Sequence, residues 1–128
     1  DGVVFHRVID GFMAQTGDVA NGDSDDASFN LQMAGTGGSD LPDVEAEFNS
    51  ESFQRGVVGA ARSQDPNSFN SQFFITYADA SFLDGQYTVF GKVVSGMEAV
   101  DALEKGPQEM NGAVANPDKI VSATIEYR

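Results

Sequence analysis

The 128 residues carry 20 acidic and seven basic side chains, which gives a formal net charge of −13. This length suffices for one domain with its own core, spanning residues 1–128, and is too short for two. The absence of cysteine excludes disulfide scaffolds, thiol nucleophiles and zinc fingers. The negative charge disfavours nucleic acid and anionic membranes as partners, and no apolar run approaches the ~20 residues that span a bilayer.

Short apolar runs separated by Gly-rich and Asp-rich segments predict a mainly β protein. The run 3–9 is followed by the turn signal Asp10-Gly11 and by a second run at 12–16, so these residues predict a hairpin. Residues 17–38 are rich in Gly, Asp, Asn and Ser, and we expect a long loop, which in a compact domain is often functional. Further strands are expected at 56–61, 71–76 and 87–94.

One helix and one last strand complete the expected elements. Residues 95–98 match the S-x-x-E capping box, so we expect a helix that begins at Ser95. Asp101 and Lys105 would form a pair one turn apart on this helix. Its apolar stripe would consist of Met97, Val100 and Leu103. Residues 121–128 alternate between apolar and polar side chains and predict a final strand, so the pattern favours an antiparallel barrel or sandwich.

Most catalytic constellations are absent from the sequence. His6 is the only histidine, which excludes a multi-histidine metal site, and no P-loop, dinucleotide fingerprint or G-x-S-x-G elbow occurs. The acidic run 23–26 has the composition of a calcium loop, but Ala27 and Ser28 stand where that loop needs Asp or Asn and Gly. The sequence therefore predicts no metal and no cofactor, with a calcium-dependent adhesion domain as a distant alternative.

The strand expected at 71–76 carries an unusual pair of side chains. Gln72 and Phe74 share one of its faces, because side chains along a strand alternate between its two faces. A lone Gln on an apolar face suggests a wet, apolar groove. The residues alone leave a second interpretation equally open, in which Gln72 only lies at the rim of a barrel.

Several blocks of sequence resemble the motifs of cyclophilin-type peptidyl-prolyl cis-trans isomerases. Residues 5–18, FHRVIDGFMAQTGD, are similar to F-H-R-[IV]-[IV]-x-G-F-M-x-Q-x-G-D, and residues 55–62, RGVVGAAR, to R-G-x-[LIV]-x-M-A-[NR]. Residues 71–75, SQFFI, match S-Q-F-F-I, while FLDG at 82–85 and TVFGKV at 88–93 resemble W-L-D-G…V-F-G-K-V. These blocks follow the family's order from Gly2 to the last expected strand.

The resemblance implies a closed antiparallel barrel of eight strands capped by two helices. We expect this chain to supply about six strands and the second helix, because the family's first two strands and first helix would precede residue 1. Arg62 and Tyr87 stand where eukaryotic members have Asn and His, which implies a bacterial type. A soluble protein of the bacterial cytoplasm or periplasm is expected, and the choice stays open because any targeting segment would lie in that preceding part.

The resemblance also implies isomerisation of X–Pro bonds in protein folding, without covalent chemistry. Arg7 would stabilise the twisted amide, with Phe12 and Gln15 as the other catalytic positions. His6 is expected to be packed and structural. The positions expected to bind substrate are Ile9, Met13, Gly35, Ala61, Arg62, Gln72, Phe74, Phe82, Leu83 and Tyr87.

The expected partners are proline-containing peptides and unfolded or folding proteins, met by a monomer. Phe82 stands where many eukaryotic members have Trp, and the missing indole N–H predicts weak binding of cyclosporin. The main alternative to an isomerase is a non-catalytic proline-peptide binding or chaperone module. Intact Arg7, Phe12 and Gln15 argue against that alternative.

Overall fold

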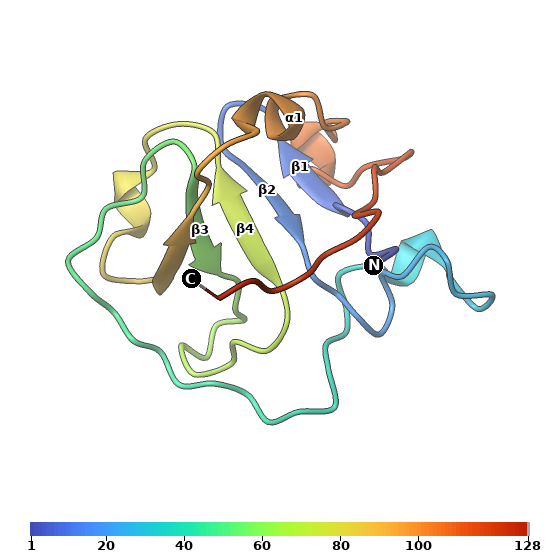
Figure 1. The fold of residues 1–128 in the computed structure, drawn as a ribbon, viewed down its shortest axis with the longest axis horizontal. Helices are drawn as coiled ribbons and strands as arrows, with labels where there is room; N and C mark the ends of the chain where they lie inside the picture. Colours follow the sequence, from blue (N-terminus) through green and yellow to red (C-terminus); the bar gives the residue numbers. More distant parts are fainter. Residues whose placement is uncertain (128) are drawn as a thin grey trace.

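The computed structural model describes residues 1–127, and its main feature is one antiparallel sheet (Figure 1). Its five strands, in the order β1-β2-β4-β3-β5, pair antiparallel throughout. Their bounds are β1 (Arg7–Ile9), β2 (Met13–Thr16), β3 (Val57–Ala60), β4 (Phe73–Thr76) and β5 (Val89–Lys92). Within residues 1–127 there is one α-helix, α1 (Met97–Asp101), and there are short 3-10 helices at Leu31–Met33, Ser81–Leu83 and Gln108–Met110. The predicted mainly β fold with one helix is confirmed.

The predicted first hairpin forms as β1 and β2. Gly11 lies in the turn with φ of 74°, a left-handed conformation that costs glycine little. The hairpin register places Arg7 opposite Gln15. Directly opposed residues of an antiparallel pair lie on the same face of the sheet, so this register brings the two side chains together.

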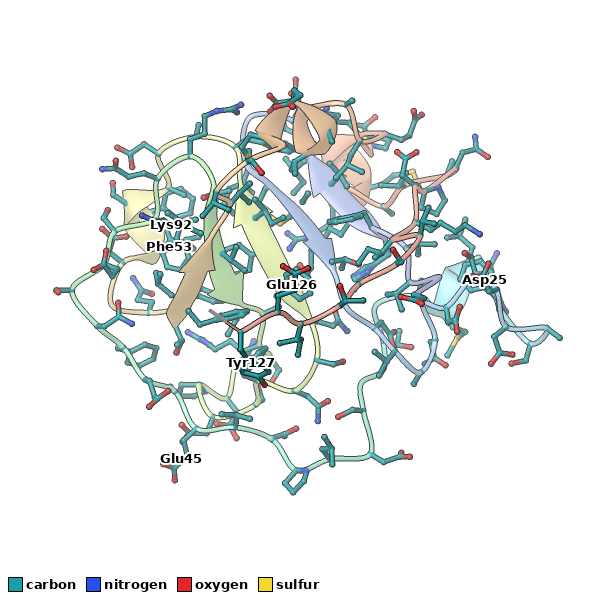
Figure 2. The ribbon with its side chains drawn as sticks, viewed as in Figure 1. Asp25, Glu45, Phe53, Lys92, Glu126 and Tyr127 are labelled. Atoms are coloured by element: carbon teal, nitrogen blue, oxygen red, sulfur yellow. The ribbon has the colours of Figure 1, made fainter. Side chains whose placement is uncertain are left out.

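The predicted last strand does not form in residues 121–127, and the sheet has five strands where we expected about six. Val121, Ile125 and Tyr127 are 79%, 80% and 93% exposed, and Figure 2 shows Tyr127 on this extended segment. Alternating side chains make a strand possible, but a strand also needs a neighbouring backbone to bond. The edges of the described sheet are β1 and β5, and neither pairs with this segment.

Helix α1 begins later than predicted, and the capping box is not made. Gly96, with φ of 84°, takes the N-cap position without a side-chain hydrogen bond, so Ser95 lies one residue too early to cap. The expected pair of Asp101 with Lys105 is also replaced, because the Asp101 carboxylate accepts from Arg55 at 2.9 and 2.7 Å. The apolar stripe is as predicted: Met97, Val100 and Leu103 pack on the core cluster around Val8 and Tyr77.

A second core cluster lies on the other face of the sheet and supports the site described below. Phe53 and Phe74 stack in it with their ring centroids 5.4 Å apart, and Phe53 is fully buried. Ile9, Met13 and Ala80 complete its buried part. Gly59 of β3 makes this stacking possible, because a Cβ there would lie 2.6 Å from Phe53 Cε1 and closer still to Phe74 Cζ.

The segment 38–52 runs as a long loop around the outside of the molecule (Figure 1). Side chains of other loops hold its backbone: Asn70 Oδ1 accepts from Ser39 N, Asn67 Oδ1 from Ala46 N, and Thr88 Oγ1 from Glu47 N. Among residues 1–127, none of the helices has the length and apolar character needed to cross a membrane.

Candidate active site

A groove of about 520 Å³ opens above the Phe53–Phe74 cluster. Met13 of β2 and Phe74 of β4 form its buried floor, with exposed fractions of 2% and 5%. The apolar walls are Phe12, Ala61, Leu83 and Tyr87. This volume is in the range of ordinary ligand pockets, and the apolar floor can hold a compact hydrophobic ring.

Arg7 lines the groove and places a charged group beside this apolar floor. Its Nη1 donates to Gln15 Oε1 at 3.1 Å, its Nε to the Asn111 carbonyl at 3.0 Å, and its Nη2 to Asn111 Oδ1 at 3.1 Å. These acceptors are neutral, so the guanidinium is held in place without a carboxylate to neutralise it. Burial lowers its pKa from the ordinary value and Tyr87 opposes this, but an arginine in a protein stays protonated.

A chain of hydrogen bonds continues from Arg7 along the groove. Gln15 Nε2 donates to Gln72 Oε1 at 2.9 Å, and Gln72 Nε2 donates to the carbonyls of Gly35 and Gly37, each at 2.9 Å. Gln15 thus accepts on the side of Arg7 and donates on the side of Gln72. This sequence of donors and acceptors determines how the side-chain amides of Gln15 and Gln72 are oriented. The bonds from Gln72 also link the glycine loop to the sheet.

A buried carboxylate holds the same glycine loop from beneath. Asp18 is fully buried, and its Oδ2 accepts from the backbone N–H of Gly35 and Gly37 at 2.8 and 2.9 Å. Its Oδ1 accepts from Ala20 and Asn21 N–H. Four N–H donors satisfy the buried charge, so Asp18 and Gln72 together position the wall of the groove that Gly35 forms.

His6 packs behind this wall and lines the groove with one edge. A Cβ on Gly35, which has φ of 97°, would lie 2.7 Å from His6 Cδ2. Burial lowers the pKa of His6 below its ordinary 6.5; Asp18 opposes this shift and Arg7 adds to it. The imidazole Nδ1 is buried and has no hydrogen-bond partner among the described residues. A neutral, packed ring fits these surroundings.

Arg62 lies at the far wall, stacked on Tyr87 with its Cζ 4.4 Å from the ring centroid. A second, polar cavity of about 330 Å³ adjoins the groove there and shares with it Gln15, Gly35, Thr36, Ala61 and Arg62. The ring of Tyr87 also meets Phe74 edge to face at 5.8 Å. Tyr87 therefore contacts both Phe74 of the apolar floor and Arg62, which also lines the polar cavity.

Comparison with known protein families shows which family the chain belongs to. The family model described as cyclophilin type peptidyl-prolyl cis-trans isomerase/CLD matches residues 1–125. The chain belongs to this family.

Curated relatives of this cyclophilin-type chain are named as peptidyl-prolyl cis-trans isomerases or as isomerase-like proteins. A probable peptidyl-prolyl cis-trans isomerase of Brucella abortus (strain 2308) is 64% identical over 126 residues, which are 98% of this chain and 64% of that protein. The rat peptidyl-prolyl cis-trans isomerase-like 3 is 44% identical over 112 residues, covering 84% of this chain and 61% of that protein. The chain thus spans less than two thirds of the length of these curated relatives.

Solved cyclophilins share its fold. The structure of a Cryptosporidium parvum cyclophilin type peptidyl-prolyl cis-trans isomerase, determined in the presence of the dipeptide Ala-Pro, superposes with a TM-score of 0.78 at 28% identity. The match covers 100% of this chain and 77% of the Cryptosporidium chain. Cyclophilin AquaCyp293 of Hirschia baltica gives a TM-score of 0.73 at 26% identity, covering 95% and 58% of the two chains.

Most positions that the cyclophilin motifs suggested line the groove, and three do not. Gln72 lines the adjoining cavity, Ile9 is buried in the core beneath, and Phe82 is 66% exposed outside the groove with its ring 5.6 Å from that of Phe12. The suggested positions that line the groove are Arg7, Phe12, Met13, Gln15, Gly35, Ala61, Arg62, Phe74, Leu83 and Tyr87.

Sequence reasoning missed one end of the groove. Met110, Asn111 and Ala113 line it there, and Asn111 makes two of the hydrogen bonds to Arg7. The Asn111-Gly112 dipeptide is a turn signal that could have marked a structured loop. No local pattern shows that this turn meets a side chain 104 residues earlier. Within residues 1–127 there is no group of three or more His, Cys, Asp or Glu side chains placed to hold a metal ion.

Proposed function

We propose that this cyclophilin-type chain accelerates the cis–trans isomerisation of X–Pro bonds. The observation that carries the proposal is the fixed, uncompensated guanidinium of Arg7 above an apolar floor. Membership of the family supports it. So does the Cryptosporidium relative studied with Ala-Pro, a dipeptide that contains the ring such a floor could hold.

The reaction requires rotation about a tertiary amide and breaks no covalent bond. The barrier of ~18–20 kcal/mol arises from amide resonance, which is lost in the twisted state as the proline nitrogen becomes pyramidal and basic. A hydrogen-bond donor aimed at that nitrogen therefore binds the transition state better than either planar isomer. Neither a nucleophile nor a general base is needed.

Arg7 has the properties of this donor. Three of its five N–H groups are engaged by Gln15 and Asn111, so two remain for substrate. Its charge cannot be lost to the apolar surroundings, because guanidinium does not deprotonate in proteins. Phe12, Met13, Phe74 and Leu83 would hold the proline ring, while Gln15 and Gln72 would bond the peptide backbone at the groove wall.

The test is isomerisation of a short X–Pro peptide, followed by NMR exchange, for the chain and for Arg7→Ala and Arg7→Lys. We expect kcat/KM to fall about 100-fold in Arg7→Ala, the size of effect seen on removing one donor to a developing charge. Arg7→Lys should retain only part of the kcat/KM of the unmodified chain, because lysine keeps the charge but lacks the planar guanidinium. Circular dichroism would verify that each variant is folded.

Lys92→Gln serves as the control, since Lys92 is exposed on β5 (Figure 2) and does not line the groove. A folded chain that binds the peptide without accelerating it would instead indicate a non-catalytic binding or chaperone module. Full activity in Arg7→Ala would remove Arg7 from the mechanism.

Cyclosporin binding is proposed to be weak. Phe82 offers no N–H donor and lies largely in solvent, where it can contribute only apolar contact. Proline-containing segments of unfolded or folding proteins are the proposed natural partners.

A further inference from the structure

No carboxylate of residues 1–127 lines the two cavities of this strongly acidic chain. Of the 20 Asp and Glu residues, none lines the groove or the adjoining cavity in the described structure. Arg7 and Arg62 both do. Asp18 lies beneath the glycine loop, where four backbone N–H groups bond its carboxylate. The charged side chains that line the two cavities are therefore both cations, while the rest of the surface carries a net negative charge.

Arg62 is held rigidly by neutral groups. Its Nε and Nη2 donate to the Gln86 carbonyl at 3.0 and 2.7 Å, and its Nη1 donates to the carbonyls of Ser63 and Gln64 at 2.9 and 3.4 Å. Tyr87 supports one face of the guanidinium. Four of its five N–H groups are thus engaged, and one N–H and the full charge are left for another ligand.

No carboxylate of the described chain pairs with Arg62. The ion pairs in residues 1–127 join Arg55 to Asp101 and Lys119 to Asp25, both away from the groove. Carbonyl dipoles orient a guanidinium without neutralising it. Because the side chain is already ordered, an incoming carboxylate would find its partner in place and lose little side-chain entropy on binding.

The position of Arg62 relates this charge to the substrate. It lines both cavities, so a peptide whose proline occupies the apolar groove and whose chain continues toward the second cavity passes beside it. We propose that Arg62 makes this groove selective for peptides with a carboxylate side chain within two residues of the proline, an inference that rests on the proposed isomerase function.

The net charge of −13 acts in the opposite direction at long range, since it repels acidic peptides. At physiological salt the Debye length is about 8 Å, which screens distant carboxylates far more than a contact at Arg62. Local attraction therefore exceeds the overall repulsion at about 0.15 M salt.

The test compares matched Glu and Gln peptides, with the varied residue at each of the two positions on either side of proline. For the unmodified chain at about 0.15 M salt, we expect kcat/KM to favour Glu over Gln by about fivefold at one of these positions, or about 1 kcal/mol. Arg62→Gln should bring this ratio close to one. Lys92→Gln removes the same charge outside both cavities and should leave the ratio intact.

Arg62→Glu gives a second readout that does not depend on absolute activity, because it should reverse the preference toward a Lys peptide. A ratio near one at every position in the unmodified chain would overturn the proposal, as would a preference for Glu that survives in folded Arg62→Gln. If no peptide is accelerated, the isomerase proposal fails by itself. The dissociation constants of the same peptides, from NMR titration, then decide the selectivity separately.

Discussion

At the scale of single residues, the site depends on neutral groups that orient a charge. Arg7 meets an amide from the next strand and an amide from a turn near the other end of the sequence. Neither acceptor reduces the charge that the proposed mechanism uses, and each restricts the rotation of the guanidinium. Losing such a contact should therefore affect turnover more than peptide affinity.

Asn111 allows this to be tested. It has φ of 55°, so Asn111→Gly keeps the left-handed backbone and the carbonyl acceptor while it removes Oδ1. We expect kcat for an X–Pro peptide to fall about tenfold, a loss in the range for a hydrogen bond to a charged group, with KM little changed.

Thermal unfolding provides the control for this variant, because a purely structural role would lower the melting temperature without a selective loss of kcat. Unchanged kcat in a folded Asn111→Gly variant would show that Gln15 and the Asn111 carbonyl suffice to orient Arg7.

His6 predicts a pH dependence of stability. Its pKa in the folded chain is lowered below 6.5 by burial, so between those two values the unfolded chain binds more protons than the folded one. The contribution of neutral His6 to stability is therefore complete above pH 6.5 and is lost as the pH falls from 6.5 through the folded pKa.

The measurement is the free energy of unfolding in urea between pH 7.5 and 5.5, for the chain and for His6→Phe. Carboxylates titrate in both proteins, so the difference between the two curves isolates the histidine. Parallel curves would mean that His6 accepts a proton without cost when folded.

At the scale of elements, the floor of the groove depends on a glycine in β3, Gly59, which has no side chain to disturb the rings packed against it. Gly59→Ala would place a Cβ against the stacked rings of Phe53 and Phe74. We expect a loss of about 1–3 kcal/mol in the free energy of unfolding, because overpacking a core forces side chains off their rotamers. Weaker peptide binding should accompany it, since Phe74 forms the floor.

Gly91→Ala is the matched control in β5. Its Cβ would lie 3.7 Å from Val58 Cβ, an ordinary contact, and both substitutions stiffen the unfolded chain equally. Equal stability of the two variants, measured by urea denaturation, would contradict the packing argument.

The helix illustrates how tertiary contacts replace local ones. The sequence around residue 95 matches a capping box, and Asp101 has a lysine one turn away. In the fold, Asp101 instead meets Arg55 in a two-bond pair that lowers the pKa of the carboxyl, and Lys105 donates to the backbone of Asp101. A planar guanidinium matches both carboxylate oxygens, which a lysine cannot do.

At the scale of the whole molecule, charge and exposed apolar side chains act against each other. Val94, Val121 and Ile125 are about four fifths exposed, and the outer edge of β5 pairs with no further strand in the described structure. The outer edge of β1 is bonded by the backbone of Gly106 and Gly112. The exposed apolar side chains and the open edge of β5 favour association, whereas a net charge of −13 opposes it.

We expect a monomer of 13.6 kDa in analytical ultracentrifugation at about 0.15 M salt. Association should appear near 1 M salt, where the Debye length falls to about 3 Å and repulsion is screened. A stable dimer at 0.15 M salt would show that apolar contacts already exceed the repulsion between chains.

The sequence by itself determined the features that depend on neighbouring residues. Turn signals and short apolar runs located all five strands. The local register of the hairpin brought Arg7 and Gln15 together, and the family motifs suggested Phe74 for the same site. Strand periodicity also placed Gln72 on the same face as Phe74 but left open whether it lies beside a groove or only at a rim. In the structure it lines the adjoining cavity, and its amide bonds the glycine loop.

Only the tertiary structure decided the contacts between distant segments. Asn111 meets Arg7 across 104 residues, Asp18 is buried beneath a loop 17 to 19 residues later, and residues 121–127 find no strand to join. Periodicity and turn residues restrict the backbone within a few positions. They do not indicate which distant groups bond a buried charge or pair with a strand edge, because those partners depend on how the whole chain packs.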